Sequence, residues 1–209
     1  TAVKRLSVWA SDELIYLDIS PTPEYDLKRD DLNHTNHSSL LGIIREVAEH
    51  CFMPLTFGGG IRDIEEIRRR LGVGADKITL NTIAVKKPEF ITQAAEKFGS
   101  QCIVISMDVA KNDQGMWEVK TGRGKEWTGL FPVKWAQEVE RRGAGEILLN
   151  SIDRDGTQSG YDIELIQEVV NAVSIPVIAI GGVGKWEDFT KALVDGKASA
   201  VSAANIFHY

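Results

Sequence analysis

Side chains capable of acid–base chemistry stand at or near the ends of apolar runs in this chain. Asp108 ends the run QCIVISMD, and Asp18 stands near the end of LIYLDIS. Further polar residues follow other apolar runs: Asn81, Thr82, Asn150 and Asp155. The carboxyl ends of parallel strands meet at one edge of a sheet, where active sites of α/β proteins form. We therefore interpret Asp108 as a catalytic acid or base, and Asp18, Asn150 and Asp155 as residues at the mouth of the same site.

Two glycine turns indicate where a ligand's anionic groups would bind. IPVIAIGGVG (175–184) and MPLTFGGGIR (53–62) align with Pro54 on Pro176, an offset of 122 residues. Glycines after a strand let the backbone approach a ligand, and the helix that follows favours an anion at its N-terminus. The repeat indicates an internal duplication with two phosphate sites. We expect one phosphate near Gly182 and Ala204-Asn205, and a weaker site near Gly60 and Thr82.

The elements that would position these residues alternate along the chain. Helical patterns are expected at 1–11, from Leu40 to about His50, and at 63–72, 88–98, 131–143, 162–173 and 185–195. Apolar strands are expected at 14–20, 53–58, 76–81, 101–108, 146–150, 175–180 and 198–204, with a hairpin inserted at 109–128. This alternation indicates parallel βαβ units. It predicts one domain, residues 1–209, of the (β/α)8 barrel type, with seven strands read and with strand one and the last helix missing from this sequence.

Composition excludes several classes of function. The formal charge of −6 argues against a nucleic-acid binder. No apolar run approaches the roughly 20 residues of a membrane helix, and Cys51 and Cys102 are interpreted as reduced thiols of a cytoplasmic protein. His34 and His37 beside Asp30 and Asp31 imitate a metal site, but the polar stretch around them favours a solvated loop. We therefore expect no metal and no cofactor.

Charged residues also stand at or near strand beginnings, at the opposite end from the expected site. Glu13, Lys77 and Glu146 occupy such positions. Two interpretations remain open. They are either solvated strand ends or charges that converge at the bottom of a barrel and form a gate.

Several longer motifs together resemble one family. FGGGIRD, ADKITLNTIAV, GAGEILLNSIDRDGTQSGYD, IPVIAIGGVG and AANIFH are similar to the cyclase subunit of imidazole glycerol phosphate synthase and its close relatives. The resemblance covers essentially the whole chain, and the SIDRDGTxSGYD block is highly specific. It implies a (β/α)8 barrel that receives ammonia from a glutaminase partner at the barrel bottom. The implied reaction is imidazole ring closure on a bisphosphorylated ribulosyl nucleotide in histidine biosynthesis, with release of an aminoimidazole carboxamide ribotide.

The resemblance also implies roles for individual residues. Asp108 matches the catalytic acid of the family. Gly60, Asn81 and Thr82 match one phosphate site, and Gly156, Gly182 and Asn205 match the other. Glu13, Lys77 and Glu146 match three residues of the charged ring through which ammonia enters.

Departures from the family pattern leave alternatives open. Asn150 stands where threonine is common, Ile180 stands where serine is common, and the general base of strand one is missing from this sequence. Asn150, Ile180 and AANIFH look more like a paralogous branch that amidates surface-polysaccharide sugars. A related sugar-phosphate isomerase and an inactive phosphate-binding fragment are further alternatives, and the charges at the strand beginnings argue against the isomerase.

The missing strand carries expectations of its own. Without strand one, the apolar strands 14–20 and 198–204 would be unprotected edges. We expect a monomer of these residues alone to be unstable or aggregation-prone and to have little or no cyclase activity. Three alternatives are open: residues before Thr1 supply strand one, two chains cover each other's open edge, or strands 14–20 and 198–204 pair directly.

Overall fold

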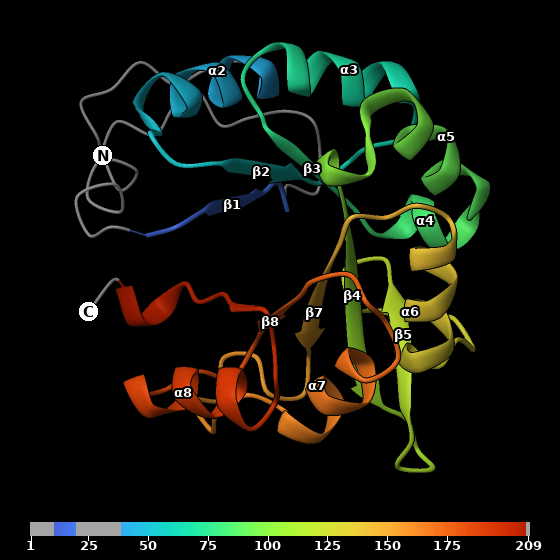
Figure 1. Ribbon diagram of the computed structural model, residues 1–209, viewed down its shortest axis with the longest axis vertical. Coiled ribbons are helices and arrows are strands. Elements are labelled where there is room, and N and C mark those ends of the chain that lie inside the picture. The colour runs from blue at the N-terminus through green and yellow to red at the C-terminus, as the bar shows by residue number, and fades with distance from the viewer. Residues whose placement is uncertain (1–10, 20–38, 208–209) are drawn as a thin grey trace. The chain divides into compact units, whose positions relative to one another are not determined.

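The computed structural model describes residues 11–19 and 39–207 (Figure 1). The helix expected at 1–11 lies almost wholly outside the described residues. The same holds for the polar stretch 20–38 with His34 and His37. The chain forms two compact units, residues 1–79 and 80–209, and each is described by itself. The prediction of a single domain stays a prediction.

The first unit is a three-stranded parallel sheet with two helices. Its elements are β1 (Leu14–Leu17), α2 (Leu40–His50), β2 (Leu55–Gly58), α3 (Ile64–Gly72) and β3 (Lys77–Leu80), the last residue of which already belongs to the second unit. β1 pairs with β2 in the register Leu14 to Leu55, and β2 pairs with β3 in the register Thr56 to Lys77. Figure 1 shows α2 and α3 side by side on one face of this sheet.

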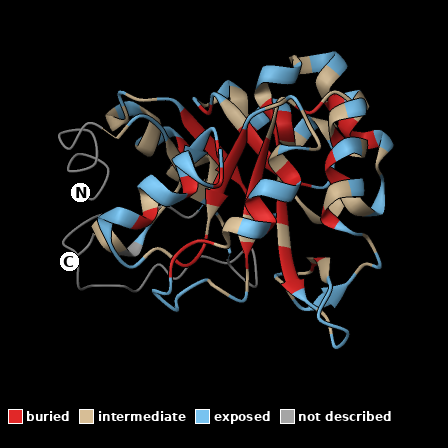
Figure 2. Ribbon diagram, turned by 60° about the horizontal axis from the view of Figure 1, so that its bottom comes forward, coloured by how far each residue is buried: buried red, intermediate tan, exposed pale blue. Residues whose placement is uncertain are grey.

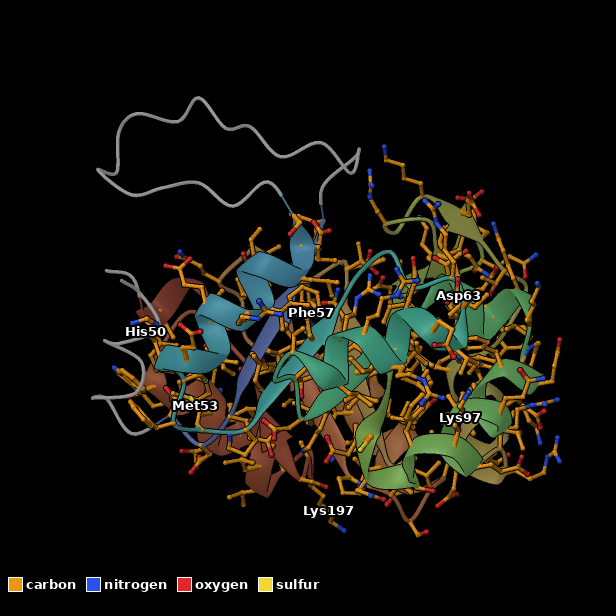
Figure 3. The ribbon with its side chains drawn as sticks, turned by 90° about the horizontal axis from the view of Figure 1, so that it is seen from above. His50, Met53, Phe57, Asp63, Lys97 and Lys197 are labelled. Carbon is orange, nitrogen blue, oxygen red and sulfur yellow. The ribbon has the colours of Figure 1, made fainter. Side chains whose placement is uncertain are left out.

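Helix starts and core positions in this unit follow from the sequence. The Asp63 carboxylate accepts a hydrogen bond from the Glu66 N–H at 2.8 Å and caps α3 (Figure 3). The Ser39 hydroxyl caps α2 by accepting from the Gly42 N–H. Such caps satisfy N–H groups that have no partner inside the helix. On β2, Phe57 is fully buried and stacks on Tyr16 of β1 with ring centroids 5.3 Å apart.

The second unit contains four parallel strands, a hairpin and five α-helices. Its strands are β4 (Ile103–Lys111), β5 (Trp117–Thr121), β6 (Glu126–Trp127), β7 (Glu146–Ser151), β8 (Val177–Ile180) and β9 (Ala200–Val201). Its helices are α4 (Thr82–Lys86), α5 (Glu89–Phe98), α6 (Pro132–Arg141), α7 (Ile163–Val170) and α8 (Trp186–Val194), with short 3₁₀ turns η2 (Ser100–Cys102) and η3 (Asn205–Phe207). The parallel order is β4-β7-β8-β9, and β5 pairs antiparallel with β4. α6, α7 and α8 follow one another along this sheet (Figure 1).

The predicted fold class is confirmed. Three parallel strands in the first unit and four in the second make seven among the described residues, in chain order within each unit. A helix or a helical turn stands between each of these strands and the next and after the last, with the hairpin inserted between β4 and α6, which is the alternation of a (β/α)8 barrel. The hairpin expected at 109–128 is also confirmed as β5 and β6.

Several element boundaries differ from the prediction. β4 continues to Lys111 because its end pairs with Trp117 of the hairpin. β9 is limited to Ala200–Val201, although the apolar pattern predicted 198–204. The short helix α4 was not predicted, because five residues are too few to show a helical period.

The duplicated segments have the same local structure. β2 begins at Leu55 and β8 at Val177, and α3 begins at Ile64 and α8 at Trp186, so both pairs keep the offset of 122 residues. Within each unit the buried residues gather on the strands and on the sides of helices that face them (Figure 2). None of the described helices has the length and apolar character needed to cross a membrane.

Candidate active site

Asp108 lies near the carboxyl end of β4, where two amides hold it. Its Oδ2 accepts a hydrogen bond from Asn81 Nδ2 at 2.9 Å, and its Oδ1 accepts one from Asn150 Nδ2 at 2.9 Å. Asn150 is the residue directly opposite Asp108 in the β4–β7 register. Asn81 directly follows β3 and precedes α4. The tertiary fold therefore brings together the predicted catalytic residue Asp108, the predicted mouth residue Asn150 and Asn81, which was predicted for a phosphate site.

The surroundings of Asp108 change its acidity. Burial raises the pKa of the Asp108 carboxyl above its ordinary value, and the charge of Asp155 adds to the rise. The hydrogen bonds from Asn150 and Asn81 lower the pKa, but they only partly offset burial. A carboxyl with a raised pKa keeps its proton closer to neutral pH, which is the property that a general acid needs.

The glycine pair after β8 packs against the protein's own backbone. A Cβ on Gly181 (φ 95°) would lie 2.7 Å from the Ser151 carbonyl oxygen. A Cβ on Gly182 (φ 103°) would lie 2.3 Å from the Gly160 carbonyl oxygen, and the Gly160 N–H donates to Gly182 O at 2.8 Å. These glycines therefore allow the loop 151–160 to pack closely against the end of β8. The sequence analysis did not predict this role. Phosphate binding at Gly182 stays a prediction.

The loop 151–160 presents Asp155 and Gly156 at its exposed tip. Gly156 has φ 73°, and no described atom lies within 4 Å of the position of its Cβ. The Asp153 carboxylate accepts from the Lys111 N–H at 2.7 Å, which ties the loop to the end of β4. Ala204 is exposed directly before η3, in which Asn205 is the first residue. The space at Gly156 is compatible with its predicted place in a phosphate site.

Two contacts in the second unit were missed by sequence reasoning. The Gly122 N–H at the hairpin turn donates to Thr82 Oγ1 at 3.4 Å, so the hairpin reaches a predicted phosphate ligand. The buried Tyr161 hydroxyl donates to the Ser202 carbonyl at 2.9 Å. Burial and the nearby Asp188 raise the pKa of Tyr161, which keeps that hydroxyl protonated. Neither pair is signalled by local sequence, because the partners are 40 and 41 residues apart.

The first unit contains the matching glycine turn. A Cβ on Gly59 would lie 2.2 Å from the Asp18 carbonyl oxygen, so this glycine also allows a close backbone approach. Gly60 has φ 65°, with no described atom within 4 Å of its Cβ position. Arg70 of α3, a buried residue that the sequence analysis missed, donates to the Gly59 carbonyl at 3.3 Å. Asp18 is half-buried beside this turn.

The charges at the strand beginnings divide between the units. In the first unit, Lys77 Nζ lies 3.0 Å from Glu13 Oε1 and 3.1 Å from Oε2. The side chain of Lys77 is 16% exposed and that of Glu13 is 36% exposed, so solvent reaches the pair from the Glu13 side. In the second unit, Glu146 is half-buried at the first position of β7. Glu13 and Lys77 therefore form an ion pair. A role of these charges in a gate stays a prediction.

Fold and site together define the class of the protein. It is a protein of the (β/α)8 barrel type with a held carboxylate at a strand end and two matched glycine turns. Comparison with known proteins adds the family. The family model described as "Histidine biosynthesis protein" matches residues 30–209, and the chain belongs to this family. It is also 46% identical over 199 residues to the imidazole glycerol phosphate synthase subunit HisF of Alkaliphilus metalliredigens (strain QYMF), covering 95% of this chain and 75% of the relative. The resemblance to the cyclase subunit, predicted from the motifs, is thereby confirmed.

Proposed function

We propose that this chain is the ammonia-using cyclase subunit of imidazole glycerol phosphate synthase in histidine biosynthesis. The family match and the HisF relative support this assignment. The observation that carries it is the Asp108 carboxyl, raised in pKa by burial and held by two amides at a strand end. In this role the chain closes an imidazole ring on a bisphosphorylated ribulosyl nucleotide.

The proposed chemistry assigns one task to each part of the second unit. Asp108 donates a proton during ring closure and is suited to this by its raised pKa. Gly156, Gly182, Ala204 and Asn205 bind one phosphate of the substrate, and Asp155 and Asn150 lie at the mouth. Asn81 and Thr82 bind the other phosphate. Asn81 also has a second role, because its amide donates a hydrogen bond to Asp108.

Ammonia is supplied by a glutaminase subunit that docks at the strand beginnings. The Glu13–Lys77 pair and Glu146 stand at that end of their strands. Charged groups in a partly buried place are costly unless paired, so their presence supports a function beyond stability. We propose that they form the gate through which ammonia enters.

Replacing Asp108 by asparagine tests the proposed reaction. In a complete barrel of this sequence, Asp108→Asn is expected to lower ammonia-dependent turnover by roughly 10²–10⁴-fold, the usual contribution of a positioned acid or base. Substrate affinity is expected to stay within about threefold, because no phosphate ligand is changed. Asp113→Asn, on the exposed hairpin turn, is the matched control and is expected to retain full turnover. A loss below about tenfold in Asp108→Asn would assign Asp108 a structural role.

A second candidate is the sugar-amidating branch of the same family. Asn150 stands where the cyclases commonly have threonine, and its amide contacts Asp108 directly. The difference therefore lies at the proposed reaction centre. Complementation separates the two candidates. If this gene restores growth without histidine to a strain that lacks its own cyclase subunit, the histidine pathway is supported. Failure to complement, with the protein present and folded, favours the sugar-amidating branch.

A further inference from the structure

The two amides around Asp108 are oriented by that carboxylate. An ionised carboxylate only accepts hydrogen bonds, so Asn81 and Asn150 both have to present their NH₂ groups to it. In this arrangement Asn81 Oδ1 and Asn150 Oδ1 are both buried, and neither has a hydrogen-bond partner among the described residues. Leaving a buried acceptor without a partner is unfavourable. Both amides nevertheless adopt this orientation, which indicates that the carboxylate determines it.

Gly181 makes room for the Asn150 side chain. A Cβ at Gly181 would lie 2.9 Å from Asn150 Oδ1, closer than a side chain could approach. The glycine after β8 therefore accommodates the carbonyl end of this amide, while the nitrogen end faces Asp108 across the β4–β7 pair. The side chain is confined from both ends.

We propose that Asn150 is a positioning residue, which together with Asn81 holds the Asp108 carboxylate at both oxygens and stabilises its ionised form. Asn150 does not need to touch the substrate in this role. It sets the direction of Asp108 and the balance between the acid and its anion. The proposal rests on Asp108 being the acid of the proposed cyclase. It adds that Asn150 controls the orientation and the ionisation of that acid.

Few charged groups lie near Asp108 among the described residues of the second unit. A shift in the titration midpoint of Asp108 can therefore be assigned to the loss of Asn150. The neighbours on β7 and at the start of α4 are the two neutral amides. Asp155, in the loop after β7, raises the pKa of Asp108 through its charge. Lys120 of β5 is opposite Asp108 in register, and its ammonium lies 4.0 Å from the centre of the Trp127 ring. Replacing Asn150 by leucine changes none of these charges.

A titration of Asp108 that needs no substrate tests the proposal directly. The ¹³C signal of the Asp108 carboxyl carbon, assigned by its absence in Asp108→Asn, is followed from acid to neutral pH in the folded chain. In Asn150→Leu we expect the midpoint to move to higher pH, because a donor to the anion is lost. Asn171→Leu, an exposed asparagine after α7, is the matched control and is expected to leave the midpoint unchanged. An unchanged midpoint in folded Asn150→Leu would overturn the proposal.

Turnover with ammonium as the nitrogen source separates this proposal from the proposed function. In Asn150→Leu we expect kcat to fall about tenfold with KM within about threefold, as for loss of an interaction that acts on the chemical step. The limb of the pH–rate profile that reports Asp108 is expected to move to higher pH. Turnover is measured in a complete barrel of this sequence. If the carbon titration shifts in Asn150→Leu but the complete barrel with Asn150 has no turnover, the cyclase function is rejected and the positioning role of Asn150 stands. If circular dichroism shows Asn150→Leu to be unfolded, Asn150→Ala removes the same donor, and its titration midpoint is likewise expected to move to higher pH.

Discussion

At the scale of single residues, the glycines of the two turns differ in what surrounds them. Gly182 has a positive φ and no space for a Cβ, because the Gly160 carbonyl and Arg154 Cβ lie within 3 Å of its place. Gly60 also has a positive φ, but its Cβ position is open. The two glycines occupy equivalent positions in the duplicated sequence. Replacing each by alanine therefore distinguishes the cost of backbone strain from the cost of steric overlap.

This contrast predicts unequal losses of stability. Gly60→Ala is expected to lower the free energy of unfolding by about 1–2 kcal/mol, the cost of the left-handed conformation alone. Gly182→Ala is expected to lose about 3 kcal/mol or more, because overpacking adds to the strain. Urea titration of both variants measures the difference. Equal losses would show that the loop 151–160 moves aside at little cost.

At the scale of elements, one carboxylate joins α6 to the segment that leads into β8. Glu140 Oε1 accepts hydrogen bonds from the Ser174 hydroxyl, the Ser174 N–H at 2.7 Å and the Ile175 N–H at 3.2 Å. These bonds lower the pKa of Glu140, the Ser174 hydroxyl contributing most. The contact fixes the chain just before the strand that ends in Gly181-Gly182.

The lowered pKa of Glu140 gives a prediction with a defined sign. A carboxyl with a folded pKa below its unfolded value contributes stability above the unfolded value, ordinarily about 4.3. This contribution is lost as pH falls through the folded value. Glu140→Ala is therefore expected to lower the free energy of unfolding by about 1 kcal/mol at pH 7, and by progressively less below about pH 4.

Denaturant titrations at pH 7 and pH 3 check this expectation. Glu164→Ala, on the exposed side of α7, is the control and is expected to lie within about 0.5 kcal/mol of the unmodified chain. A Glu140→Ala deficit that is as large at pH 3 as at pH 7 would show that the charge of Glu140 does not carry the contact.

At the scale of the whole molecule, docking of the proposed glutaminase partner would explain why charged residues stand at the strand beginnings. Lys77 is mostly buried and pairs with Glu13 in the first unit. If this pair belongs to an ammonia gate, ammonia released by the glutaminase partner has to pass it. Nitrogen that enters from solvent at the mouth does not pass through it.

Lys77→Ala is therefore expected to impair glutamine-dependent turnover at least about fivefold more than turnover with free ammonium. The measurement uses the complex with a glutaminase subunit, assayed separately with glutamine and with ammonium. Lys134→Ala, exposed on α6, is the control and is expected to change neither rate. Equal losses on both nitrogen sources would mean that the pair is structural only.

Several features of this protein were determined by its sequence alone. Apolar periodicity and the punctuation by glycine and proline are local, so they predicted the order of strands and helices, including both members of the duplicated segment. The motifs were specific enough to predict the family. Asp108 was recognised because a lone carboxylate at the end of an apolar strand stands out in the sequence.

Only the tertiary structure decided which side chains meet. Asn81 and Asn150 are 27 and 42 residues from Asp108, and no local pattern states that both amides donate to it. The contact with Asn150 depends on strand register, and register is set by packing between distant segments. The same holds for Gly181 and Gly182: the sequence showed two glycines, whereas the fold shows that the space of their missing side chains is filled by the loop 151–160.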